Sequence, residues 1–304
     1  MALTLPARLP QGGQLGLIAP AGPGSLDAEQ AQAWAAGHGY GLKVYPGVFE
    51  KTGYLAGSDA TRLADLHAAF EDPAIDAILC LRGGYGTPRL LERIDYPLIA
   101  RHPKPFVGYS DITALHVAFI QRAGLLTFHG PLFRSELLLH QQPGEAALLR
   151  MLRGELGEGD LIAHPAGWPL ATLAGGSAEG PLLGGNLAVL CATLGTPWAI
   201  DTKGVVLFIE DVNEPLYRLD RLLTQLRLAG KLRSLAGVLV GDFAGVTLEQ
   251  LCPLLEECFA PLGIPVLAGW RSGHCQPNLT LPLGARVELD ADAQRVTLKQ
   301  AVVS

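Results

Sequence analysis

The segment at residues 106–115 reads Phe-Val-Gly-Tyr-Ser-Asp-Ile-Thr-Ala-Leu. Its apolar start predicts a strand, and the residues after Ser110 predict a helix, so the serine stands at a sharp bend. Such a bend exposes a serine hydroxyl to a base and points the first N–H groups of the helix at the same place. The segment departs from Gly-x-Ser-x-Gly, because Ile112 and Thr113 follow Asp111 where the second glycine would stand. Serine is also a favoured helix N-cap, so a nucleophile and a cap both remain open.

Apolar strands and amphipathic helices alternate on both sides of this segment. Near-continuously apolar strands that are separated by helices predict a parallel sheet covered on both faces, and therefore the α/β class. In such sheets, ligands bind beyond the carboxyl ends of the strands, where Ser110 and the glycine-rich residues 82–86 both fall. The predicted strands cover residues 14–19, 42–45, 77–81, 105–109 and 126–129, and the predicted helices cover residues 28–37, 59–70 and 111–122, with another helix through Leu90 and Leu91.

The alternation of apolar strands and amphipathic helices weakens between residues 137 and 176, and a different arrangement of strands and helices follows. We therefore predict an N-terminal domain at residues 1–140, a linker at 141–175 and a smaller C-terminal α/β domain at 176–304. Within the second domain we expect strands at 204–210, 235–241 and 265–267, helices at 187–194, 219–226 and 248–259, and a closing hairpin of residues 286–289 and 295–298.

Composition excludes several classes of function. The chain has 304 residues, 49% of them hydrophobic, and a net charge of −6 without a lysine or arginine run. Neither nucleic acid nor an anionic membrane is therefore an expected partner, and no apolar stretch is long enough to span a bilayer. The N-terminus does not resemble a signal peptide, so we expect a cytoplasmic protein with reduced cysteines. Cysteine and histidine spacings predict no metal site.

A nucleophilic serine needs a base, and the base needs an orienting group. Glu210 ends an apolar run, where a carboxylate is costly without a partner. His274 lies in a loop with glycine before it and proline soon after. Ser110, His274 and Glu210 would together supply nucleophile, general base and orienting carboxylate. A helix-capping acid and an exposed loop histidine are the alternatives.

The glycine-rich loop at residues 82–86, Arg-Gly-Gly-Tyr-Gly, follows a predicted strand. Glycines let backbone N–H groups approach a ligand closely, and one of them could pair with the N–H of Asp111 as an oxyanion hole. A phosphate cradle and a plain tight turn are the alternatives, although the loop matches neither phosphate-binding motif. Arg82 could hold a substrate carboxylate, or equally an acid of the protein.

Two other residues near these motifs are weaker candidates. Cys275 adjoins His274, but no basic cluster surrounds it to activate a thiolate. His129 follows a predicted strand and could approach the site, although a structural hydrogen bond is the expected role.

Taken as a set, the motifs resemble the LD-carboxypeptidases of the serine peptidase clan that includes the microcin immunity proteins. The resemblance covers nearly the whole chain. It rests on Ile-Ala-Pro-Ala-Gly-Pro at 18–23, Tyr-Leu-Ala-Gly-Ser-Asp at 54–59, Arg-Gly-Gly-Tyr-Gly at 82–86, Gly-Tyr-Ser-Asp at 108–111, Leu-Gly-Gly-Asn-Leu at 183–187, Glu-Asp at 210–211 and Gly-His at 273–274.

The resemblance implies roles for residues at the matching positions. Ser110, Glu210 and His274 would be the catalytic triad, and the backbone N–H groups of Gly84 and Asp111 the oxyanion hole. We also expect Arg82, Gly83 and Tyr85 to contact substrate. The implied fold is a flavodoxin-like or amidotransferase-like N-terminal domain with a smaller C-terminal α/β domain, in a homodimer without cofactor or metal.

The implied reaction is hydrolysis of the amide between meso-diaminopimelate and the terminal D-alanine of a cytosolic murein tetrapeptide during cell-wall recycling. Two alternatives stay open. One is an immunity-type hydrolase of aminoacyl-adenylate analogues, which would need an aromatic side chain to stack on adenine; Trp168, Trp198 and Trp270 are available. The other is a non-catalytic protein that binds a small ligand.

Overall fold

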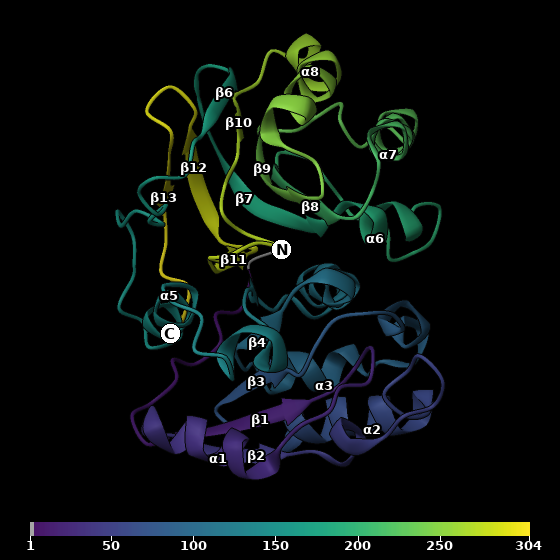
Figure 1. Ribbon diagram of the computed structural model, residues 1–304, viewed down its shortest axis with the longest axis vertical. Helices are drawn as coiled ribbons and strands as arrows, with labels where there is room; N and C mark the ends of the chain where they lie inside the picture. The colour runs from purple at the N-terminus through teal and green to yellow at the C-terminus, as the bar shows by residue number, and fades with distance from the viewer. Residues whose placement is uncertain (1–2) are drawn as a thin grey trace.

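The alternation of strands and helices builds two β-sheets, and the computed structural model describes residues 3–304 of the chain (Figure 1). One sheet forms the core of an N-terminal lobe, the lower one in Figure 1. The other sheet forms the core of a C-terminal lobe, the upper one. The predicted α/β class is therefore confirmed. Within the described part of the chain, no helix is long and apolar enough to cross a membrane.

The N-terminal sheet has the strand order β11-β5-β4-β3-β1-β2. Its five N-terminal strands run parallel, and β11 pairs antiparallel with β5. Every residue of β3 is buried, as the continuous apolar pattern predicts. The strands are β1 (Gln14–Ile18), β2 (Gly41–Val44), β3 (Ala77–Cys80), β4 (Phe106–Gly108), β5 (Thr127–His129) and β11 (Leu281–Leu283).

Helices cover this sheet, and their starts follow the capping signals in the sequence. The Asp27 side chain accepts the N–H groups of Glu29 and Gln30 at the first helix, and Ser58 accepts that of Thr61 at the second. The helices are α1 (Ala28–Gly37), α2 (Asp59–Glu71), α3 (Tyr96–Arg101), α4 (Thr113–Ala118) and α5 (Gly144–Leu152).

Two helix predictions in this lobe need correction. The helix expected through Leu90 and Leu91 is absent: two short 3₁₀ turns, Thr87–Arg89 and Leu91–Arg93, take its place. Thr87, which begins the first turn, is held by Asp111: its N–H and its hydroxyl both donate to that residue. The helix expected at residues 111–122 is divided into a 3₁₀ turn, α4 and a π turn at Phe119–Ala123.

The C-terminal sheet has the strand order β13-β12-β7-β8-β9-β10-β6 and mixes parallel with antiparallel pairs. Its strands are β6 (Ala171–Ala174), β7 (Ser177–Asn186), β8 (Val206–Val212), β9 (Gly237–Ala244), β10 (Val266–Ala268), β12 (Arg286–Asp290) and β13 (Arg295–Leu298), and its helices are α6 (Leu187–Ala192), α7 (Leu216–Leu228) and α8 (Leu248–Phe259).

Strands β6 and β7 are not evident from the sequence. In β7, glycines and a proline hide the strand pattern, yet the close packing of the sheet requires them. A Cβ on Gly184, whose φ is +148°, would lie 1.8 Å from the carbonyl oxygen of Phe208. Strand β6 lies within residues 141–175 and pairs with β10, so part of the expected linker belongs to the C-terminal sheet.

Strand β11 connects the two lobes. The chain leaves the C-terminal sheet after β10, joins the N-terminal sheet as β11, and returns to the C-terminal sheet as β12. A single buried apolar cluster also extends through both lobes, from Leu17 in β1 to Leu281 in β11 and Leu298 in β13. The lobes therefore share both a strand and a core.

Candidate active site

Ser110 occupies the bend that the sequence predicts between β4 and the helical segment. Its φ is +65°, in the left-handed region that residues other than glycine rarely adopt. The glycine-rich loop packs directly against it, since a Cβ on Gly83 would lie 2.7 Å from the Ser110 Cβ. Strand end, serine and glycine-rich loop therefore meet at one point.

A buried histidine of α4, His116, contacts the strand end at this bend. His116 Nε2 lies 2.8 Å from the carbonyl oxygen of Gly108, and its Nδ1 lies 2.9 Å from Thr127 Oγ1. Burial lowers the pKa of His116 to about 3, so the ring is neutral and has one N–H to donate to the Gly108 carbonyl. Spacing in the sequence does not reveal this role.

Glu210 lies within β8 rather than at its end, because the strand continues to Val212. The ladder with β9 shifts register between Ile209 and Asp211, so Glu210 stands at an irregularity of the sheet. Such irregularities re-aim side chains and are frequent beside active sites. The Glu210 side chain is fully buried.

His274 joins the serine to the carboxylate. Its Nε2 lies 3.2 Å from Ser110 Oγ, and its Nδ1 lies 2.6 Å from Glu210 Oε2. Three predicted residues that are up to 164 positions apart in the chain thus form a continuous hydrogen-bonded series. This is the arrangement of nucleophile, base and orienting carboxylate.

The charges of the pair reinforce each other. Burial alone would raise the pKa of the Glu210 carboxyl, but the imidazoles of His129 and His274 lower it to about 2. Burial alone would lower the pKa of His274, but the hydrogen bond and charge of Glu210 raise it above the ordinary value. The carboxylate is therefore ionised and favours a protonated His274, the form that exists after a base has taken a proton.

The backbone around His274 is held by hydrogen bonds that could not be predicted from the sequence. We call residues 269–280, between β10 and β11, the histidine loop. In this loop, the N–H of Gly273 donates to Asn278 Oδ1 at 2.9 Å, and Asn278 Nδ2 donates to Glu136 Oε1 at 3.2 Å. Gly273 has φ +110°, and a Cβ there would lie 2.6 Å from Glu210 Oε2. A glycine is therefore required before the histidine.

The backbone N–H groups of Gly84 and Asp111 donate to no other protein group among residues 3–304. The Asp111 side chain is occupied elsewhere, since its Oδ2 accepts the N–H of Thr87 at 2.8 Å. Both N–H groups are thus available to a ligand beside Ser110.

Of the expected substrate contacts, Arg82 and Tyr85 each make a contact within the fold. Arg82 Nη1 donates to the carbonyl oxygen of Pro23 at 2.9 Å, and no carboxylate within residues 3–304 pairs with its guanidinium. Tyr85 is half exposed and packs edge-to-face on the exposed Tyr54, with ring centroids 5.5 Å apart.

His129 and Cys275 also lie near the site. The His129 Nε2 is 3.9 Å from Glu210 Oε1, and neither atom has a hydrogen-bond partner among the described residues. Burial raises the pKa of the Cys275 thiol, which donates to the carbonyl oxygen of Pro277. His129 is therefore a second imidazole beside the carboxylate, and Cys275 is a poor nucleophile.

A buried polar network joins the serine segment to the C-terminal lobe. Thr113 Oγ1, on α4, accepts the N–H of Asn186 at 2.9 Å. Asn186 caps α6 through Val189 N and donates from Nδ2 to Asp211 Oδ1. The Leu-Gly-Gly-Asn-Leu motif at residues 183–187 thus serves to seat α6 and β7 on the helix that follows Ser110.

Comparison with known proteins agrees with this geometry. The family model for the LD-carboxypeptidase N-terminal domain matches residues 15–130, and that for the C-terminal domain matches residues 179–289. A probable murein peptide carboxypeptidase of Bacillus subtilis is 41% identical over 310 residues, which cover 98% of this chain and 95% of that protein.

Two solved structures extend the comparison. Muramoyltetrapeptide carboxypeptidase from Oxalobacter formigenes superposes with a TM-score of 0.80 at 29% identity, covering 94% of this chain and 97% of that one. The microcin C7 self-immunity protein MccF, solved with aspartyl sulfamoyl adenosine, gives a TM-score of 0.89 at 25% identity, covering 99% and 100%. With both halves matched and the fold shared, the chain belongs to the LD-carboxypeptidase family.

Proposed function

We propose that the protein is a serine LD-carboxypeptidase that hydrolyses the amide to the terminal D-alanine of murein tetrapeptides. The single observation that carries this proposal is the position of His274 between Ser110 Oγ, at 3.2 Å, and Glu210 Oε2, at 2.6 Å. The similarity to proteins named murein peptide and muramoyltetrapeptide carboxypeptidases supports the choice of substrate.

The proposed mechanism is acyl transfer in two steps. His274 takes the Ser110 hydroxyl proton while Oγ attacks the carbonyl carbon between meso-diaminopimelate and D-alanine. The protonated His274 then gives the proton to the leaving D-alanine nitrogen as the C–N bond breaks, which leaves an ester on Ser110. Water, deprotonated by His274, hydrolyses this ester and frees the shortened peptide.

The Gly84 and Asp111 N–H groups would hold the negative oxygen of each tetrahedral intermediate. Loss of one such donor typically costs about 100- to 1,000-fold in rate. We assign the D-alanine carboxylate to the guanidinium of Arg82, because it has no carboxylate partner in residues 3–304, and we assign further substrate contacts to Gly83 and Tyr85.

The proposal includes a cellular setting. We propose peptidoglycan recycling in the cytoplasm as its role, with a tetrapeptide released from murein and recovered for reuse as the substrate. We further propose a homodimer and a reaction without a cofactor.

The decisive experiment removes the nucleophile. Ser110→Ala is expected to abolish D-alanine release from a murein tetrapeptide while leaving the unfolding midpoint close to that of the parent, because the change deletes one hydroxyl. Ser177→Ala, on the exposed start of β7, is the matched control and should retain full activity. Full activity in Ser110→Ala would contradict the serine mechanism.

A second candidate is hydrolysis of an aminoacyl-adenylate analogue, which the similarity to MccF favours. Trp168 is partly exposed and could stack on adenine, but the Arg271 guanidinium already lies 3.9 Å over its ring. Trp198 donates to Tyr96 Oη, and Trp270 is buried. Turnover of a murein tetrapeptide and of an aminoacyl sulfamoyl adenosine by the same preparation separates the two functions, and binding without turnover of either would indicate a non-catalytic protein.

A further inference from the structure

Three potential metal ligands that are scattered in the sequence meet outside the triad. His38 caps the C-terminal end of α1, His140 precedes α5, and Glu145 lies in the first turn of α5. One ligand atom from each of them lies within 4.8 Å of the other two. Sequence spacing predicts no metal site here, because His38 and His140 are 102 positions apart and come together only in the folded chain.

Both ring nitrogens of His38 face an oxygen acceptor. Its Nδ1 lies 2.8 Å from the carbonyl oxygen of Trp34, and its Nε2 lies 2.6 Å from Glu145 Oε1. A doubly protonated imidazole would donate to both acceptors, whereas a singly protonated one would leave one nitrogen free to ligate a metal ion. A backbone carbonyl on one nitrogen is the usual way in which a protein orients the other nitrogen toward a metal ion.

Glu145 is oriented in the same manner. Its side chain is only 3% exposed, and its Oε2 accepts the indole N–H of Trp34 at 3.3 Å. The same oxygen lies 3.6 Å from His140 Nδ1. Trp34 therefore fixes both His38 and Glu145, and the carboxylate is shared between two imidazoles.

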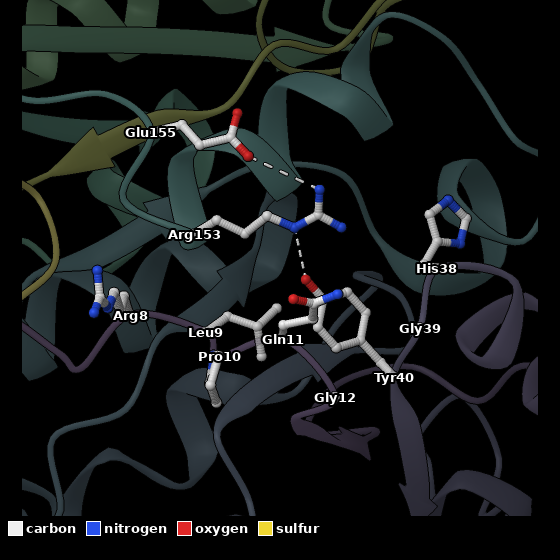
Figure 2. Close-up of a pocket in the computed structure, with 10 residues that line it drawn as sticks. All are labelled: Arg8, Leu9, Pro10, Gln11, Gly12, His38, Gly39, Tyr40, Arg153 and Glu155. Atoms are coloured by element: carbon white, nitrogen blue, oxygen red, sulfur yellow. Dashed lines mark hydrogen bonds and ion pairs between the residues drawn. The ribbon is translucent and has the colours of Figure 1, made fainter.

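The third ligand leaves room for water. The His140 side chain is 63% exposed, and its ring is nearly parallel to that of His38, with centroids 6.1 Å apart. His38 also lines a cavity of about 750 Å³, drawn in Figure 2, where it stands apart from Arg8, Tyr40 and Arg153. Because the His140 side chain is mostly exposed, a hydrated cation can reach the cluster from solvent and keep a water ligand.

The donor set selects the class of cation. Two imidazoles and one carboxylate suit zinc and similar transition metals, whereas Mg²⁺ and Ca²⁺ prefer six or more oxygens. Zinc binds nitrogen at about 2.0–2.1 Å and carboxylate oxygen at about 2.0–2.2 Å, usually in a tetrahedron. The Nε2 of His38 and Oε1 of Glu145 would have to separate from their present 2.6 Å, while His140 would move closer to the carboxylate.

We propose that His38, His140 and Glu145 bind one zinc-class divalent cation, which clamps the C-terminal end of α1 to the start of α5. The ion's role is structural. The α5 start also packs on the histidine loop, since a Cβ on Gly144 would lie 2.6 Å from the carbonyl oxygen of Asn278. Bound metal thus stabilises the element on which that loop rests.

The test is calorimetric titration of the full-length protein with zinc chloride after chelator treatment. We expect about one zinc ion per chain at this site, and an affinity that falls at least about tenfold in His140→Ala. This side chain is mostly exposed, so the variant should fold, and His102→Ala, another histidine at a helix end, is the matched control. Mg²⁺ should not compete.

Cysteines or His274 could also take up zinc, so the comparison between variants decides the result. Zinc at 100 times its Kd should shift the folding equilibrium about 100-fold in the parent and in His102→Ala, but not in His140→Ala. Equal zinc affinity and equal stabilisation in His140→Ala and the parent would overturn the proposal, and so would the absence of saturable binding, which would leave an ordinary ion pair between His38 and Glu145.

Discussion

Glu210 faces two imidazoles at once, with one oxygen 2.6 Å from His274 Nδ1 and the other 3.9 Å from His129 Nε2. A fully buried carboxylate is expensive unless charged or polar groups surround it. The arrangement keeps Glu210 ionised. Because Glu210 is fully buried, little water screens the effect of its charge on His274. His274, the proposed general base, therefore owes its raised proton affinity chiefly to the Glu210 carboxylate.

This dependence predicts the pH profile. A base works only when unprotonated, so kcat/KM should fall as the pH drops through the pKa of His274, which Glu210 raises above the ordinary 6.5. In Glu210→Gln the neutral amide removes that effect. The acid limb should move to lower pH, and the rate at its optimum should drop about 1,000- to 10,000-fold. Coincident acid limbs in parent and variant would count against the assignment.

Gly273 offers a steric test of the same contact. In Gly273→Ala, the new Cβ would lie 2.6 Å from Glu210 Oε2 on a backbone with φ +110°. Backbone strain of about 1–2 kcal/mol and overpacking of about 1–3 kcal/mol should both lower the free energy of unfolding, and activity should be lost as Glu210 is displaced.

Gly176→Ala is the control for Gly273→Ala. Its φ of +105° is similar, but no atom of residues 3–304 lies within 4 Å of its added Cβ. Denaturant unfolding should show the loss of stability that backbone strain alone causes, and the rate of D-alanine release should be unchanged. Equal losses in the two variants would mean that the contact with Glu210 does not matter.

Single residues differ in how far the sequence reveals them. Ser110 and His274 stand in short motifs with glycine neighbours, so their chemistry can be predicted. Glu136 and Asn278 are ordinary polar residues in weakly patterned segments, and only folding makes them neighbours. Their importance follows from burial, which a single sequence does not display.

At the scale of elements, the helix after Ser110 is built from three helical types in succession: a 3₁₀ turn, α4 and a π turn. Irregular helical turns of this kind are frequent at functional sites. Strand β7 lies against this segment, and a Cβ on Gly185 would meet Thr113 Oγ1 at 2.5 Å. The position of the serine therefore depends on an element of the other lobe.

Thr113→Val tests this link. Valine keeps the shape but removes the acceptor of the buried Asn186 N–H, which should cost about 1–3 kcal/mol of unfolding free energy and reduce kcat by disturbing α4. Thr193→Val is the control. Among the described residues the Thr193 hydroxyl, at the C-cap of α6, donates only to the carbonyl oxygen of Leu190 three positions earlier, so its loss should cost less than about 1 kcal/mol. Chemical denaturation and initial rates measure both effects, and a harmless Thr113→Val would show that the link is dispensable.

Elements with regular patterns follow from the sequence, as α1 and α8 do with the predicted bounds of 28–37 and 248–259. Elements held by tertiary contacts do not. Strand β11 has three residues and a central proline, so only its pairing with β5 defines it. The 3₁₀ turns after Gly86 stand where the sequence predicts a helix, and the contacts of Thr87 with Asp111 that hold the first turn form only on folding.

At the scale of the whole molecule, the two lobes are joined by more than one chain crossing. Strand β11 completes the N-terminal sheet from the C-terminal part of the sequence, and one apolar cluster extends through both lobes. The domain limits at residues 140 and 176 stay predictions. The pattern of apolar and polar residues indicates where one kind of segment gives way to another. It does not show that a later strand, β11, pairs with the N-terminal sheet.

The shared strand and core predict a single unfolding transition. Neither lobe can unfold without exposing the apolar surface or the strand edge of the other, so intermediates should not accumulate. Scanning calorimetry should give one peak with a calorimetric enthalpy close to the van't Hoff enthalpy. Two resolved peaks, or an enthalpy ratio near two, would show lobes that unfold independently.

The histidine loop begins at β10 in one sheet and ends at β11 in the other. Any parting of the lobes therefore pulls on the segment that carries His274 and widens its 3.2 Å gap to Ser110 Oγ. A displacement of about 1 Å can cost about 100-fold in rate. The contact between Ser110 and its proposed base therefore depends on the closed arrangement of the two lobes, and a molecule in which they part should lose activity even if each sheet stays intact.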